Sequence, residues 1–89
     1  MSARRPKSYY REQRRDMIRL LTRSQSFWQA ESARWHRMVD ELSAILAGYP
    51  ATRTKAHEVL EGFQQWADEA DLCVRRDARE LKKWRAKKV

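Results

Sequence analysis

Glycine and proline are scarce in this chain of 89 residues, and their placement constrains the fold more than any other feature. One of the two glycines, Gly48, and one of the two prolines, Pro50, lie two residues apart near the middle. Gly48 suits a helix C-terminus that ends in a left-handed residue, and Pro50 cannot continue a helix. Residues 7–47 and 51–89 contain no proline at all. The sequence therefore predicts a single reversal of the chain, at residues 48–52.

Apolar residues recur at spacings of three and four on both sides of this turn, which is the pattern of a helix with one apolar face. We predict an all-α protein, an antiparallel helical hairpin. A basic flexible arm (1–7) precedes a single helical domain (8–89), whose first arm covers 8–48 and second arm 53–87. Ser8 and either Thr52 or Thr54 are the candidate N-caps.

The first arm has one weak region, where polar residues interrupt its apolar face between Ser24 and Ser32. Ser26-Phe27-Trp28-Gln29 also fits a capping box, which marks the start of a helix. A break near Ser24–Ser26 would give three helices instead of two. Because neither glycine nor proline occurs there, we place a continuous or bent helix ahead of a break.

The apolar faces are wide and rich in aromatic residues, with four Trp, three Tyr and two Phe in the chain. Two helices cannot shield such faces from water, and exposed apolar surface usually marks an interface. We expect either a dimer of hairpins that forms a four-helix bundle or docking into a larger assembly; a self-contained three-helix bundle is the alternative. The predicted interface and core residues are Leu21, Trp28, Trp35, Met38, Leu42, Phe63, Trp66, Val74, Leu81 and Trp84.

The net charge of +8 is distributed unevenly along the chain. Residues 1–23 carry eight Lys or Arg and two acids, and residues 73–89 also carry eight and two. The segment between them, residues 24–72, carries four Lys or Arg and eight acids. In a hairpin the two basic segments lie together, opposite an acidic turn end. Such a concentration of positive charge attracts polyanions.

The sequence contains no catalytic or cofactor motif: no glycine-rich phosphate loop, no Gly-x-Ser-x-Gly and no His-Glu-x-x-His. We predict that the protein is not an enzyme and uses no cofactor. His36, His57 and Cys73 fall far apart along a hairpin, so we expect no metal site. The single cysteine suits a reducing compartment, and no apolar run reaches membrane-spanning length. We therefore expect a cytoplasmic protein and no membrane partner.

Basic residues recur every four positions in both arms, as Arg11, Arg15, Arg19 and Arg23 and as Arg75, Arg79, Lys83 and Lys87. Like charges at this spacing destabilise an isolated helix, which suggests that an anionic partner completes the structure. The planar fork of arginine suits phosphate. We predict non-sequence-specific binding of the DNA or RNA backbone. The predicted contacts are Arg4, Arg5, Lys7, Arg11, Arg15, Arg19, Arg23, Arg75, Arg79, Lys83, Arg85 and Lys87.

The competing interpretation is a small regulatory protein that docks on a host protein through its Trp-rich face, with the charges steering association. In general makeup the chain is short, basic, helical and aromatic-rich. In this it is similar to small helical subunits of nucleoprotein assemblies, including those of CRISPR effector complexes. This similarity is one of composition and assigns no role to any residue.

Overall fold

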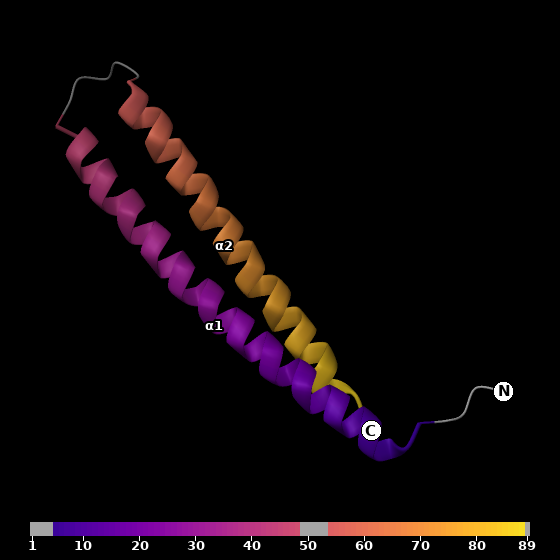
Figure 1. Ribbon diagram of the computed structural model, residues 1–89. Helices are drawn as coiled ribbons and strands as arrows, with labels where there is room; N and C mark the ends of the chain where they lie inside the picture. Colours follow the sequence, from indigo (N-terminus) through magenta and orange to yellow (C-terminus); the bar gives the residue numbers. More distant parts are fainter. Residues whose placement is uncertain (1–4, 49–53, 89) are drawn as a thin grey trace.

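Two long antiparallel helices form a hairpin in the computed structural model, which describes residues 5–48 and 54–88 (Figure 1). Helix α1 comprises Lys7–Leu46 and helix α2 comprises Lys55–Ala86. The molecule is a rod with extents of 70 × 23 × 15 Å. The predicted all-α helical hairpin is confirmed. Within the described residues, neither helix has an apolar stretch long enough to cross a membrane.

Helix α1 is continuous, so the alternative with a break near Ser24–Ser26 is wrong. The capping box that begins at Ser26 is not used, because the pairing with α2 continues across it. Half-buried residues recur every seven positions along α1, and seven residues make two turns of a coiled helix pair. This regular series consists of Arg14, Leu21, Trp28, Trp35 and Leu42.

Two of the predicted helix ends differ from those observed. Helix α1 begins at Lys7 after an extended Pro6, so Ser8 lies inside the helix and is not the N-cap. Gly48 follows α1 without a positive φ, so it does not take the predicted left-handed conformation. Its N–H instead donates to the carbonyl of Ile45 (3.3 Å), an i to i−3 bond that tightens the last turn. Tyr49, Pro50 and Thr52 lie outside the described residues.

Thr54 caps the start of α2, as one of the two predicted candidates. Its backbone is extended, and its carbonyl accepts hydrogen bonds from the N–H groups of His57 (3.0 Å) and Glu58 (3.3 Å). The Thr54 N–H in turn donates to Nδ1 of His57 (3.2 Å). His57 thus takes the place that Glu or Gln has in the usual capping box.

The core between the helices is small. Ala67, Ala70 and Leu81 are the buried apolar residues of the described chain, together with one buried acid, Asp77, and no large side chain is fully buried. The α2 residues at the interface again recur every seven positions, as Ala56, Phe63, Ala70, Asp77 and Trp84. The two helices therefore leave most of their large apolar side chains partly in water.

Candidate nucleic-acid interface

Arg14 holds the two basic segments together at the end of the rod that carries the termini. Its Nε donates to the carbonyl of Trp84 (3.0 Å) and its Nη2 to the carbonyl of Arg85 (2.9 Å). The last carbonyls of a helix have no partner within the helix, and a cation there also complements the helix dipole. Arg14 therefore caps α2 and sets the register of residues 5–23 against residues 73–88. We call this part of the rod the basic end.

Sequence reasoning missed Arg14 because it treated arginines as surface cations. The signal was present in the spacing, since position 14 begins the seven-residue series that continues at Leu21 and Trp28. A charged residue in such a series is at the helix interface. There it needs hydrogen-bond acceptors, which the end of α2 supplies.

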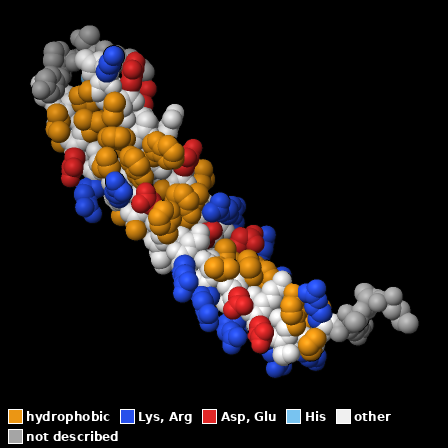
Figure 2. All heavy atoms as spheres, in the orientation of Figure 1, with side chains coloured by type: hydrophobic (Ala, Val, Ile, Leu, Met, Phe, Trp, Pro, Cys, Tyr) orange, Lys and Arg blue, Asp and Glu red, His pale blue; other side chains and the backbone are white. Residues whose placement is uncertain are grey.

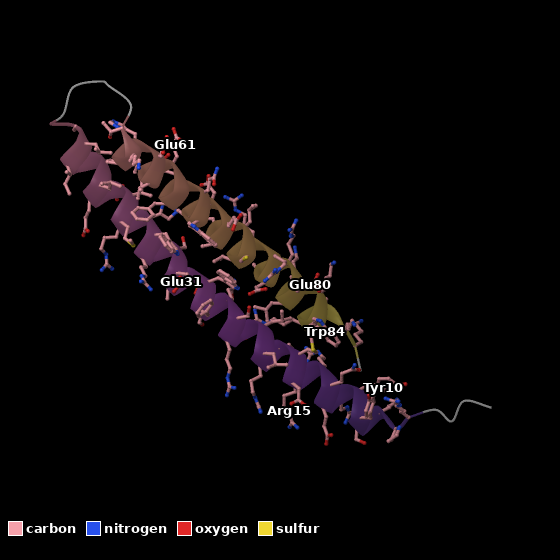
Figure 3. The ribbon with its side chains drawn as sticks, turned by 45° about the horizontal axis from the view of Figure 1, so that its top comes forward. Tyr10, Arg15, Glu31, Glu61, Glu80 and Trp84 are labelled. Atoms are coloured by element: carbon pink, nitrogen blue, oxygen red, sulfur yellow. The ribbon has the colours of Figure 1, made fainter. Side chains whose placement is uncertain are left out.

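Every predicted contact residue within the described chain is exposed, and Arg4 lies outside the described residues. The two series do not form straight rows, however. A step of four residues turns an α-helix about 40° beyond a full turn, so three steps from Arg11 to Arg23 turn by about 120°. Figure 3 shows Arg15 on α1 at the end of the rod that also carries Tyr10 and Trp84. The predicted series therefore wind around the rod instead of facing one partner together.

One side of the rod, here called the polar side, is defined by contacts between Ser32, His36 and Asp71. The Ser32 hydroxyl donates to Oδ1 of Asp71, and Nε2 of His36 lies 2.9 Å from Oδ2 of the same carboxylate. The Ser32 hydrogen bond is the main reason that the pKa of Asp71 lies below its ordinary value of 3.8; the hydrogen bond to His36 acts in the same direction. Burial opposes both, and the charges of His36 and Arg75 lower the pKa of Asp71 further.

Several predicted cations lie on this polar side at the basic end. Positions seven apart share a side of the helix pair, so Arg11 lies in line with Ser32 and Arg15 with His36. On α2, Arg85 lies in line with Asp71, and Arg75 lines a shallow depression next to Asp71. Lys82, which the sequence prediction omitted, is seven positions from Arg75. The polar side of the basic end thus presents Arg11, Arg15, Arg75, Lys82 and Arg85.

The remaining predicted cations lie elsewhere or contact their own chain. Lys83 pairs with Glu80 (3.3 Å), and Lys87 Nζ lies 3.7 Å from the centre of the Trp84 ring. Arg5 lies over the ring of Tyr9 at 4.5 Å and also contacts the Tyr9 hydroxyl. Arg23 and Arg79 belong to the outer faces of their helices. Position on the rod therefore separates a polar-side group of predicted cations from a dispersed group.

The opposite side of the rod, here called the apolar side, carries an open hollow of about 370 Å³. Trp35 packs against Phe63 (5.4 Å between ring centres) and stacks on Trp66 (6.0 Å, 19° between planes). Trp66, one of the predicted interface or core residues, is 56% exposed on the single hairpin, because Phe63, Ala67 and Ala70 are the α2 positions that meet α1. The hollow is lined by Phe27, Trp28, Glu31, Trp35, Trp66, Glu69, Ala70 and Cys73.

The other predicted interface and core residues lie between the helices to different degrees. Leu81 is buried. The rest are half-buried: Leu21, Trp28, Trp35, Met38, Leu42, Phe63, Val74 and Trp84. Among the residues that the structure describes, no group of three His, Cys, Asp or Glu side chains gathers in a way that would hold a metal ion.

Comparison of the chain with protein-family models found no match, and comparisons with curated proteins and with solved structures found none either. The fold and the placement of charge therefore carry the functional argument.

Proposed function

We propose that this protein binds nucleic acid through the phosphate backbone, using the polar side of its basic end. The observation that supports this is the convergence of cations from two segments some 60 residues apart in sequence. Arg11 and Arg15 from α1, together with Arg75, Lys82 and Arg85 from α2, occupy one side of one end of the rod. The Arg14 hydrogen bonds to Trp84 and Arg85 hold these segments in register.

The chemistry of these residues favours phosphate as the ligand. Four of the five are arginines, whose planar guanidinium group matches phosphate with paired hydrogen bonds. Residues 75–85 extend over about 15 Å of helix, long enough to follow several phosphates of one strand. Within residues 5–48 and 54–88, neither helix offers a pattern that would read base edges, so the proposed binding is insensitive to sequence. Neither a cofactor nor a metal has a role in it.

The test is the affinity for short duplex DNA, single-stranded DNA and RNA, measured by fluorescence anisotropy over a range of salt concentrations. If five phosphates are neutralised, log K should fall against log salt with a slope of about −4.5 on duplex DNA. Replacing one arginine from each helix, in the double variant Arg15→Glu/Arg85→Glu, should weaken binding to every sequence at least about 50-fold near 0.1 M salt and reduce the slope by about 2.

Two matched double variants serve as controls, since each changes the net charge by the same amount. Arg34→Glu/Arg37→Glu alters exposed arginines outside the basic end, and Arg23→Glu/Arg79→Glu alters exposed arginines at the basic end but off the polar side. Both should lose much less affinity. Equal losses in all three variants would mean that only net charge matters. Tight binding of one protein, with no affinity for nucleic acid, would instead support the docking interpretation.

A further inference from the structure

Six of the eight exposed large hydrophobic residues in the described part of the rod lie on one side. Positions seven apart share a side, so Leu20 lies in line with Phe27, and Val59 with Trp66 and Cys73. Tyr10 and Ile45 are in line with Glu31, which lines the same hollow. Figure 2 shows hydrophobic side chains gathered over both helices from the turn end to the middle of the rod. The exposed fractions of this group are Tyr10 42%, Leu20 58%, Phe27 56%, Ile45 59%, Val59 49% and Trp66 56%.

The hollow on this side lies at the middle of the rod. Phe27 and Ala70, which both line it, are the midpoints of α1 and α2. The small side chain of Ala70 at a core position leaves space beside Trp28 and Trp35. A two-fold axis that passes through the hollow, perpendicular to the rod, would bring a second copy into overlap along its whole length. Each copy would then present an exposed Phe27 to the hollow of the other, as an isologous interface requires.

We propose that the apolar side is the contact surface of an antiparallel homodimer, in which two hairpins pack into a four-helix bundle. The charge distribution favours a second copy of this chain as the partner, and it favours antiparallel over parallel packing. A parallel pair would bring together two basic ends, each with a large excess of Lys and Arg. An antiparallel pair places each basic end beside the partner's residues 24–72, where acids outnumber bases eight to four. Packed helices lie 8–10 Å apart, about one Debye length at physiological salt, so this attraction is only partly screened.

The size of the surface suits such a dimer. The broad face of the rod measures 70 × 23 Å, which exceeds the roughly 800 Å² per partner of a standard interface. Each hairpin alone buries only Ala67, Ala70 and Leu81 among its described apolar residues, so it gains much by covering the rest. The polar sides of both copies remain outside the bundle. The dimer therefore does not rest on the proposed nucleic-acid site, and either proposal can fail without the other.

The first experiment measures the mass of the full chain by sedimentation equilibrium, from micromolar to submillimolar concentration, without nucleic acid. The wild type should be a dimer, and Phe27→Asp should raise its dissociation constant at least about 100-fold, because the lost burial counts twice. The matched control is Leu72→Asp. Leu72 is 58% exposed, like Phe27, but it lies between Asp71 on the polar side and Cys73 on the apolar side, so it points away from α1. Its substitution should leave the dimer intact.

The direction of packing is tested by spin-label distances between copies of the double variant Ser8→Cys/Cys73→Ser, labelled at position 8. An antiparallel dimer places the two labels a distance apart that approaches the 70 Å length of the rod. A parallel dimer places them within about the width of the pair, and this result would overturn the proposed orientation.

Three other results would overturn the proposal as a whole. One is a wild-type monomer of full helicity at all concentrations, which would leave the apolar side to a different partner. Another is a trimer or larger assembly. The third is equal weakening by Phe27→Asp and Leu72→Asp with helicity unchanged in circular dichroism, which would place the contact elsewhere. Trp66→Asp provides a second substitution on the apolar side, and it should act as Phe27→Asp does.

Discussion

At the scale of single residues, Asp77 is the least expected part of the core. It occupies the series that contains Ala70 and Trp84, and it is 2% exposed. Its Oδ1 lies 3.4 Å from Nε of Arg76, whereas its Oδ2 is buried without a hydrogen-bond partner among the described residues. A buried carboxylate oxygen that has lost water without gaining a partner destabilises the folded state.

We predict that Asp77→Ala raises the free energy of unfolding by about 1–3 kcal/mol, because it removes this unsatisfied group. Urea denaturation followed by circular dichroism measures the change. Asp68→Ala is the matched control, an exposed aspartate of the same helix, and it reports the gain from helix propensity alone. Equal gains in the two variants would show that the buried oxygen is not a source of instability.

Asp71 gives the hairpin a dependence on acid pH. Its pKa is lowered in the folded state, mainly by the Ser32 hydrogen bond and then by that of His36, relative to an ordinary value of 3.8. The stability that it contributes is therefore fully present above pH 3.8 and is lost as the pH falls through the lower, folded-state pKa. We predict that Asp71→Asn flattens the loss of stability in this acid range, measured by urea denaturation from about pH 5 to pH 2. Asp68→Asn should leave that loss unchanged.

At the scale of the helices, α1 and α2 differ in how they meet each other. Helix α1 brings Trp28 and Trp35 to the interface, and α2 accommodates them with Ala67 and Ala70. This match of large against small side chains keeps the helices close over a long contact. It also explains why α1 runs without a break through its polar middle. Residues on both sides of Ser26 are held by the same partner helix, so no local capping signal competes with the pairing.

Gly62 is a weak point within α2 that can be corrected. It lies in the helix interior without a positive φ, and a Cβ added there would meet nothing within 4 Å. We predict that Gly62→Ala raises the free energy of unfolding by about 0.5–1 kcal/mol, through the lower helix propensity of glycine. The measurement is urea denaturation in the Phe27→Asp background, so that dimer formation does not contribute.

Gln65→Ala, at an exposed position of the same helix, is the control for Gly62→Ala and should change stability by only a few tenths of a kcal/mol. A loss of stability in Gly62→Ala would mean that another surface packs closely against residue 62.

At the scale of the whole molecule, the antiparallel dimer predicts a particular shape in small-angle X-ray scattering. Two hairpins that overlap along their length should keep a maximum dimension close to that of one rod, 70 Å along the long axis, while the cross-section grows. The Phe27→Asp monomer is the reference for both quantities. A wild-type maximum dimension much larger than that of the monomer would indicate end-to-end association and contradict the bundle.

The two helices and the reversal between them can be predicted from the sequence. The periodic apolar residues of residues 7–46 and 55–86 act over single turns, and the pair Gly48 and Pro50 acts within a few residues, so both signals are readable without tertiary contacts. The excess of cations in two terminal segments was equally plain. Local signals failed at Ser8, which lies inside α1 because the helix begins at Lys7, and at the capping box of Ser26, where the helix continues.

Which residues the two helices bury, cap or leave exposed in each other became clear only from the tertiary structure. Arg14 caps the end of α2 and Asp77 is buried, and the sequence predicted neither outcome. Trp66, one of the predicted interface or core residues, is 56% exposed on the single hairpin. The members of each basic series also lie on different sides of their helix, because a spacing of four does not match the spacing of seven that pairs the helices. These outcomes depend on the register between residues far apart in the sequence, such as Arg14 and Trp84, and side-chain size and hydrogen bonding across the interface set that register.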